Sequence, residues 1–161
     1  MTSIAAMQDV PRAQRRVPSD LFGHLDVTDE QILSFAEGLL GFPTCTQWVL
    51  VDGVRAGTAW LQSADQPSLA FLLVDPFVLF EGFTADLDAN EVRRLGANAP
   101  SELAVFSIVT LPGADREDAT ANLQGLVVIN VRSRRGAQVL TGDGRWAVRQ
   151  PLALASLKAS S

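Results

Sequence analysis

The most restrictive feature of this sequence is an unbroken apolar run, LAFLLV, at residues 69–74. A polar turn precedes the run, and Asp75 and Pro76 end it. Successive side chains of a β-strand point to opposite faces, so a strand of this composition is apolar on both of its faces. Such a strand is typical of a position that is covered on both sides. We therefore expect residues 69–74 to form a central strand.

Most of the remaining sequence alternates between apolar and polar residues, which favours further strands. The strands expected from this alternation are 21–27, 32–38, 47–53, 58–63, 77–83, 102–111, 126–133, 137–140 and 145–148. Two hairpins are expected, one across the loop from Gly53 to Gly57 and one across the Thr-Gly-Asp-Gly sequence at 141–144.

One helix is expected within residues 84–98, with Asp86 or Asp88 as its N-cap and Gly96 as its stop. Many short strands with one or two short helices indicate a mostly β, single-domain fold, either an antiparallel β-barrel or a sandwich-like arrangement. A chain of 161 residues, of which 47% are hydrophobic, is long and apolar enough to bury one such core.

The ends of the chain differ from its middle. We expect a flexible basic N-terminal tail at residues 1–18, a β domain at 19–152 and a flexible C-terminal tail at 153–161. The N-terminus has no signal-peptide core, and no apolar run approaches the roughly 18 residues that a membrane span needs. The only cysteine, Cys45, can form no intramolecular disulfide. These features favour a cytoplasmic protein.

Charge is distributed unevenly along the chain, whose net charge is −5. Residues 19–91 hold twelve Asp or Glu against Arg55 alone, whereas residues 92–161 hold nine Arg or Lys against five acids. Such a field can speed encounter with an oppositely charged partner, although acids that merely solvate strands and loops explain the pattern equally well. An anionic body disfavours direct binding to nucleic acid, because it repels phosphates.

Few residues could perform catalysis. His24 is the only histidine, and no Gly-x-Ser-x-Gly turn presents a serine nucleophile. Cys45 has no His or Lys near it in the sequence, and the glycine-rich motifs that cradle phosphates are absent from the sequence. We therefore expect no enzymatic activity, no bound metal and no cofactor.

Five blocks of the sequence are informative when they are taken together. They are FAEGLLGFP (35–43), AWLQSADQPSLAFLLVDP (59–76), ELAVFSIVTLP (102–112), TANLQGLVVIN (120–130) and AQVLTGDGRWAVRQPL (137–152). In this order they resemble the FliW family of bacterial flagellar assembly factors, over about residues 21–152. The sequence departs from the usual family pattern at Leu40, where proline is common, and at Gly125-Leu126, where Ala-Pro is common.

This resemblance implies a partner-switching regulator. Proteins of the FliW kind bind the translational regulator CsrA, which represses flagellin mRNA, and they also bind flagellin, which frees CsrA. Apart from the resemblance, the anionic charge disfavours direct contact with nucleic acid, and the lack of long apolar runs disfavours a membrane. A monomer is favoured because the sequence shows no heptad pattern and no large exposed apolar stripe.

The contact residues that we predict are polar residues at turns of the acidic half and one aromatic anchor: Glu37, Asp65, Asp75, Glu81 and Phe42. Capping and core packing, respectively, would equally explain Glu37 and Phe42. Asn122 and Asn130 are expected to satisfy backbone groups in turns.

A second interpretation stays open from the sequence, in which a small β-barrel binds a nucleotide or a flavin-like ligand. The three tryptophans, Trp48, Trp60 and Trp146, could line such a pocket. A chromophore that co-purifies with the protein would favour this alternative.

Overall fold

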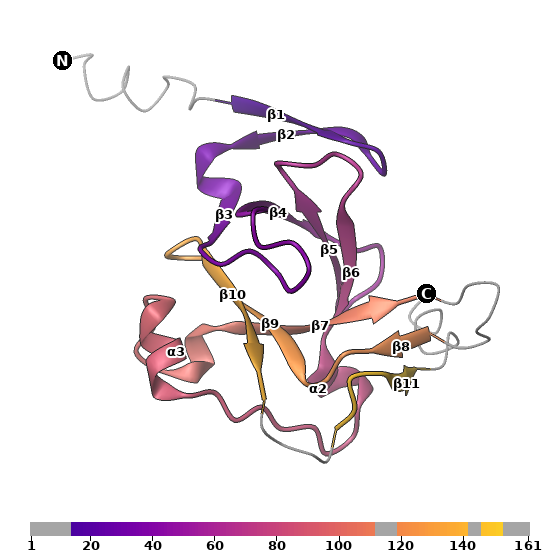
Figure 1. The fold of residues 1–161 in the computed structure, drawn as a ribbon, viewed down its shortest axis with the longest axis vertical. Coiled ribbons are helices and arrows are strands. Elements are labelled where there is room, and N and C mark those ends of the chain that lie inside the picture. Colours follow the sequence, from indigo (N-terminus) through magenta and orange to yellow (C-terminus); the bar gives the residue numbers. More distant parts are fainter. Residues whose placement is uncertain (1–13, 112–118, 142–145, 153–161) are drawn as a thin grey trace.

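A computed structural model describes residues 14–111, 119–141 and 146–152 (Figure 1). Its strands are β1 (Gln14–Ser19), β2 (Gly23–Thr28), β3 (Ile32–Phe35), β4 (Gln47–Asp52), β5 (Thr58–Ser63), β6 (Ala70–Val74), β7 (Ala104–Thr110), β8 (Ala119–Ala121), β9 (Gly125–Asn130), β10 (Arg135–Leu140) and β11 (Gln150–Leu152). The helices are α2 (Pro76–Leu79), α3 (Ala89–Arg94) and two 3-10 helices, Asp29–Gln31 and Pro100–Glu102. The expected mostly β fold with short helices is confirmed.

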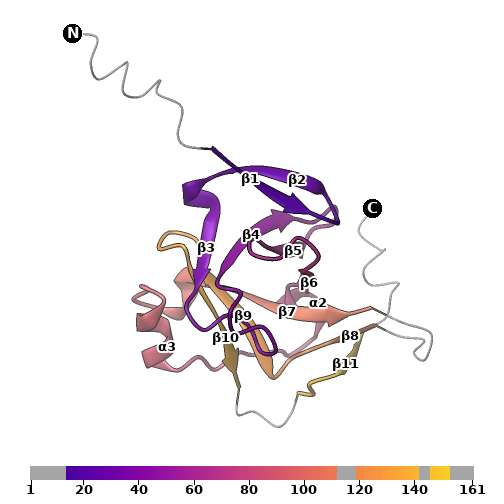
Figure 2. The same ribbon diagram turned by 45° about the horizontal axis from the view of Figure 1, so that its top comes forward.

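Seven of the strands close into a barrel. Their order is β7-β6-β5-β4-β3-β10-β9, and β9 pairs back with β7. All neighbours in this ring are antiparallel except β3 and β10, which run parallel and pair only through Ser34 with Arg135 and Phe35 with Gly136. β8 and β11 extend the sheet beyond β7, while β1 and β2 form a separate hairpin over β3 to β5 (Figures 1 and 2).

The apolar run that ends at Val74 lies at the centre of this arrangement, as expected. β6 pairs with β5 on one edge and with β7 on the other. Phe71 and Leu73 point into the barrel core, together with the fully buried Trp48. Leu72 and Val74 point outward into a second cluster. Both faces of β6 are therefore apolar because the barrel is packed inside and covered outside.

Two satellite clusters cover the outer face of the barrel. In the first, Phe80 and Phe83, which follow α2, pack with Val74 of β6. In the second, Val17 of β1 and Val27 of β2 pack with residues of β3 and β4. These covers remove from water the apolar outer faces that an open antiparallel sheet would leave exposed.

The segment after Asp75 is helical, so the prediction of a strand at 77–83 is wrong. Asp75 is the N-cap of α2 and accepts a hydrogen bond from the Phe77 N–H, and Pro76 lies in the first turn. Proline suits that position because its φ is already helical and its missing N–H would have no intrahelical partner there. Of the apolar residues that suggested a strand, Leu79, Phe80 and Phe83 pack in the outer cluster, whereas Phe77 and Val78 are exposed.

β10 pairs with β9, so the predicted hairpin between 137–140 and 145–148 is wrong. The predicted strand 126–133 ends at Asn130, and the tight turn follows at 131–134. Asn130 Oδ1 accepts hydrogen bonds from the backbone N–H groups of Arg132 and Ser133, and Arg134 has a φ of 61°. Since no glycine marks this turn, its signal in the sequence is weak. Residues 146–148 lie in no strand, and residues 142–145 lie outside the described residues.

The N-terminal boundary of the β domain also differs from the prediction. Residues 14–18, which were assigned to the tail at 1–18, belong to β1, because Val17 is buried and β1 pairs with β2. Residues 1–13 and the predicted tail at 153–161 lie outside the described residues. β8, with the sequence Ala-Thr-Ala, was not predicted, because three small residues show no legible alternation. Among the described helices, none is long and apolar enough to cross a membrane.

Candidate functional site

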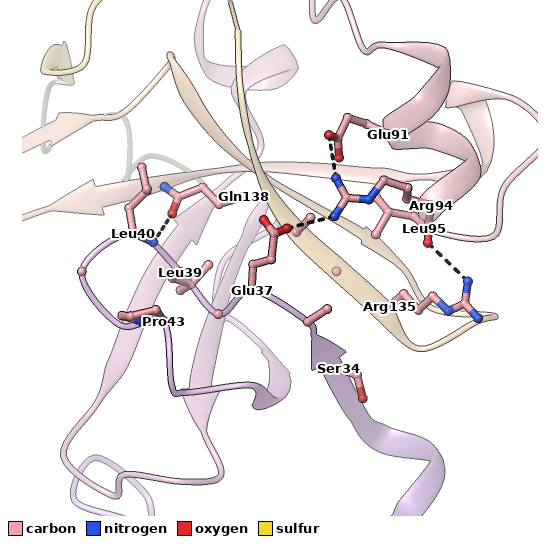
Figure 3. Close-up of a pocket in the computed structure, with 15 residues that line it drawn as sticks. Ser34, Glu37, Leu39, Leu40, Pro43, Glu91, Arg94, Leu95, Arg135 and Gln138 are labelled. Atoms are coloured by element: carbon pink, nitrogen blue, oxygen red, sulfur yellow. Dashed lines mark hydrogen bonds and ion pairs between the residues drawn. The ribbon is translucent and has the colours of Figure 1, made fainter.

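A groove of about 620 Å³ lies between three elements that are distant in the sequence (Figure 3). They are the loop at 36–43 that follows β3, the helix α3 and the strand β10. Apolar side chains line the groove together with four charged ones, Glu37, Glu91, Arg94 and Arg135. The groove opens beside β10 where the short pairing with β3 ends.

The loop at 36–43, which we call the plug loop, is anchored in the barrel core. Leu39 and Phe42 contact that core and are joined by two backbone hydrogen bonds, of 2.8 and 3.3 Å between N and O. Gly38 has a φ of 64°, and a Cβ at this position would collide with the carbonyl of Phe42, so glycine is required. Leu40 stays outside, with 63% of its surface exposed, and its N–H donates to Gln138 Oε1 at 2.8 Å.

α3 begins and ends at strong local signals. Of the two predicted caps, Asp88 is the N-cap, and it accepts a hydrogen bond from the Asn90 N–H at 3.0 Å. Gly96 follows the helix with a φ of 78°, as the predicted stop requires. Val92 is buried, which leaves the charged residues of the helix on its outer side.

The C-terminal end of α3 is fixed to the turn between β9 and β10. The carbonyl of Leu95 accepts hydrogen bonds from Asn130 Nδ2 at 2.8 Å and from Ser133 Oγ at 2.6 Å. Asn130 therefore satisfies backbone groups, as predicted, and so does Asn122, whose Oδ1 accepts from the N–H groups that follow it. The two bonds to the Leu95 carbonyl fix the C-terminal end of α3, so the helix forms a rigid wall of the groove.

Arg94 is the electrostatic centre of the groove. Its Nη2 lies 3.1 Å from Glu37 Oε1 on the plug loop, and its Nη1 lies 3.1 Å from Glu91 Oε1 on the same helix (Figure 3). The hydrogen bond to Glu37 and the charge of Glu91 raise the pKa of Arg94 above its ordinary value. The pair with Glu37 connects α3 to the plug loop across the groove.

Arg135 lies at the other end of the groove wall. Its Nη1 donates to the backbone carbonyl of Arg94 at 3.3 Å, which holds the Arg135 guanidinium at the C-terminal end of α3 (Figure 3). Within the described ranges Arg135 has no carboxylate partner, whereas Arg94 has two. Arg94, Glu37 and Glu91 together therefore carry a formal charge of −1, and the cationic end of the groove lies at Arg135.

The structure places two of the predicted contact residues on the plug loop, but in different environments. Glu37 is exposed and faces the groove through its pair with Arg94. Phe42 is half-buried, and its ring lies edge to face against Phe71 at 5.7 Å between centroids. The expectation that Phe42 is an exposed anchor is therefore wrong, because the ring completes the barrel core.

The other three predicted contact residues lie away from the groove. Asp65 accepts hydrogen bonds from the N–H groups of Thr46 and Gln47, and Asp75 caps α2, so both carboxylates hold turns together. Glu81 is exposed just after α2. Asp65 precedes β6 and Asp75 follows it, so the structure does not bring the predicted residues to one place.

Of the residues that line the groove, the sequence reasoning singled out only Glu37 as a contact. Those that it missed include Leu40, Arg94, Arg135 and Gln138. The one sequence pattern that could have indicated part of the groove is Gly-Leu-Leu-Gly at 38–41, because two leucines between glycines indicate a tight loop with an apolar tip. Arg94 and Arg135 are 41 positions apart in the sequence, and no local pattern connects residues at that separation.

The three tryptophans do not line a common pocket, so that expectation is wrong. Trp48 is buried in the barrel core, Trp60 lies outside the barrel against Phe22, and Trp146 packs with the outer cluster near Phe80. The lining of the groove contains no aromatic residue. Among the residues that the structure describes, no group of three or more His, Cys, Asp or Glu could hold a metal ion.

Comparison with known proteins agrees with this architecture. The model of the FliW protein family matches residues 16–152. The flagellar assembly factor FliW of Treponema denticola is 33% identical over 144 residues, which cover 89% of this chain and 97% of the relative. The flagellar assembly factor FliW of Magnetococcus marinus is 35% identical over 132 residues, which cover 81% of this chain and 80% of the relative.

A solved structure gives the same result. A crystal structure of the flagellar assembly factor FliW superposes with a TM-score of 0.78 at 30% sequence identity, and the match covers 86% of this chain and 97% of that chain. The match of the family model over most of the sequence and the shared fold lead to one conclusion. The chain belongs to the FliW family of flagellar assembly factors.

Proposed function

We propose that this protein binds the translational regulator CsrA in the cytoplasm, relieves its repression of flagellin mRNA and is in turn sequestered by flagellin. The family supports a role in flagellar assembly. The two partners are what the sequence resemblance implies, and the structure has to offer a surface of suitable chemistry to each.

The observation that favours a cationic partner is the exposure of the acidic half. Of the twelve carboxylates in residues 19–91, ten are exposed, and the other two, Asp75 and Glu91, are half-buried. A protein that binds RNA neutralises phosphates with basic side chains, so its binding surface is cationic. A complementary anionic surface speeds the encounter and can compete with RNA for those side chains.

Glu37, Asp65, Asp75 and Glu81 remain the proposed contacts to CsrA. Because they lie on different turns, their contribution is spread over the surface instead of forming one hot spot. Such long-range charge effects weaken as salt is added, since the Debye length falls to about 8 Å at physiological ionic strength. Affinity for CsrA is therefore expected to fall with salt.

The test is a calorimetric titration of this protein with CsrA from the same organism, repeated after saturation with monomeric flagellin. Binding to CsrA that flagellin abolishes is the expected result. A second readout is release of flagellin leader RNA from CsrA in a mobility-shift assay. Absence of binding to both proteins would overturn the proposal.

The acidic contacts can be tested with a matched pair of variants. In the first, Glu37→Lys and Glu81→Lys are combined with Asp65→Asn, which keeps the acceptor that Thr46 and Gln47 need. In the control, Asp52→Lys and Asp86→Lys are combined with Asp20→Asn, which changes the net charge equally. The first variant is expected to lose CsrA affinity and salt dependence more than the control. Equal losses of CsrA affinity in the two variants would show that only the net charge of the protein influences binding and that Glu37, Asp65 and Glu81 make no specific contact.

A further inference from the structure

We propose that the groove accepts an extended segment of flagellin as an additional strand beside β10, with an apolar side chain of the segment between Leu40 and Leu140 and a carboxylate at Arg135. The inference rests on the proposed function, because it takes flagellin to be a partner. Its basis is the backbone of β10. One edge of this strand pairs with β9 along all six residues, whereas the other edge pairs with β3 at only two residues.

The hydrogen-bond pattern shows which backbone groups of β10 face the groove. Toward β9, the N–H of Thr141 donates to the carbonyl of Gln124 at 2.7 Å, and toward β3, the carbonyl of Arg134 accepts from the Ser34 N–H at 2.8 Å. In an antiparallel ladder successive residues direct these groups to opposite edges. The polar backbone groups of Gln138 and Leu140 therefore point to the β3 edge, away from β9.

On the edge toward β3, the hydrogen-bond ladder ends before it reaches the backbone groups of Gln138 and Leu140. β3 pairs with β10 only as far as Gly136. Beyond that point the plug loop runs alongside, and within the described residues it is joined to this part of β10 by the bond from Leu40 N–H to the Gln138 side chain. Among the described residues, the backbone groups of Gln138 and Leu140 thus have no partner on this edge, which borders the groove at Gln138. Such an edge is the site at which an extended peptide adds a strand to a sheet.

The side chains around this edge fit one apolar residue of an incoming strand. Leu40 lines the groove and is 63% exposed. Leu140 lies two residues beyond Gln138, the last lining residue of β10, on the same face of the strand, and is 68% exposed. Leu39, Pro43 and Leu95 line the groove between α3 and the plug loop. Large apolar side chains exposed beside a groove lose their contact with water when a segment binds there.

The charges select a partner with a carboxylate. Arg135 lines the groove, and neither Arg135 nor the adjacent Arg134 has a carboxylate partner among the described residues. Arg94 already has two carboxylate partners, Glu37 and Glu91, so these three side chains carry a formal charge of −1 and offer no free cation. Unpaired arginines repel the cationic surface of an RNA-binding regulator and attract an acidic segment. Of the two proposed partners, flagellin is therefore the one that we assign to Arg135 and the edge of β10, while Glu37, on the plug loop, stays a proposed contact to CsrA.

Amide hydrogen exchange of single residues, followed by NMR, tests the geometry directly. In the free protein, the N–H groups of Gln138 and Leu140 are expected to exchange quickly, while those of Ala137 and Val139, which bond to β9, exchange slowly. Saturation with monomeric flagellin should slow Gln138 and Leu140 by about tenfold or more and leave the other two slow. Unchanged exchange at Gln138 and Leu140 in a saturated complex would overturn the inference.

Two substitutions at one position separate the backbone from the side chain. Leu140→Pro removes the groove-facing N–H and leaves the bonds to β9, whereas Leu140→Ala keeps the N–H and removes the apolar side chain. We expect flagellin affinity to fall at least about tenfold in L140P, less in L140A, and CsrA affinity to stay unchanged in both. If L140P does not fold, as judged by circular dichroism, the inference is tested by Arg135→Glu and by the exchange experiment. R135E is also expected to weaken flagellin binding.

The outcomes separate the two proposals. If the wild-type protein binds neither partner, the proposed function fails, and the assignment of the groove fails with it. If flagellin binds the wild type, L140P and R135E equally well, only the inference fails. Loss of CsrA affinity in these variants would show that the groove serves the other partner. Protection of Gln138 and Leu140 that grows with protein concentration in the absence of flagellin would show that a second copy of this chain occupies the edge.

Discussion

β9 and β10 are adjacent strands of six residues each in the same barrel, yet they perform different tasks. All six residues of β9 are buried, and the strand pairs with β10 on one edge and with β7 on the other. β10 has only Gly136 and Val139 buried, and its pairing with β3 covers two residues. A strand that is covered on both faces and both edges can only support the fold. A strand with one open edge can also bind.

The largest effect is expected from shortening a side chain of β9. Ile129 is fully buried in the barrel core, so Ile129→Ala should lower the free energy of unfolding by about 2–5 kcal/mol, through lost burial and the cavity that remains. Urea denaturation measures the change. Val131→Ala is the control, because Val131 lies in the turn that directly follows β9 and is 61% exposed; its expected effect is within about 0.5 kcal/mol. Similar losses in both variants would contradict the rigid role of β9.

The next effect is expected where β10 meets β3. A Cβ on Gly136 would collide with the ring of Phe35, which is fully buried. Gly136→Ala should therefore cost about 1–3 kcal/mol by overpacking. In a Phe35→Leu background the same substitution should cost less, because the ring that it meets is absent. Equal costs in both backgrounds would show that the collision is relieved in another way, for instance by a shift of β10.

Sequence reasoning found the features of this fold that are written in local patterns. The apolar run of β6, the hairpin of β4 and β5 and the caps of α3 at Asp88 and Gly96 each depend on residues that are close in the chain. Where two local patterns competed, the sequence-based prediction chose the wrong one. After Asp75, an apolar alternation suggested a strand, but the Asp-Pro cap started a helix.

The groove could not be predicted because it is made by long-range pairing. β3 and β10 are parallel neighbours separated by about a hundred residues in sequence, and parallel pairing leaves no turn motif to signal it. Glu37 was singled out for its charge, but its pairing with Arg94 of α3 depends on where the helix is docked. That docking in turn depends on Asn130 and Ser133, which hold the carbonyl of Leu95.

The smallest effect on stability is expected at the open edge of β10 itself. Gln138→Ala removes the acceptor of the Leu40 N–H, and since water can reach this loop, the loss should be about 1 kcal/mol or less. Gln138→Glu keeps an acceptor and is the matched control. The clearer readout is local: the Leu40 amide should exchange faster in Q138A than in Q138E, while the amides of β9 stay protected in both. If Q138A instead destabilised the whole barrel as strongly as G136A, this edge would be as structural as the edge toward β9. β9 and β10 would then both serve mainly to stabilise the barrel, and the groove would be a structural contact between β10 and the plug loop instead of a binding site for a partner.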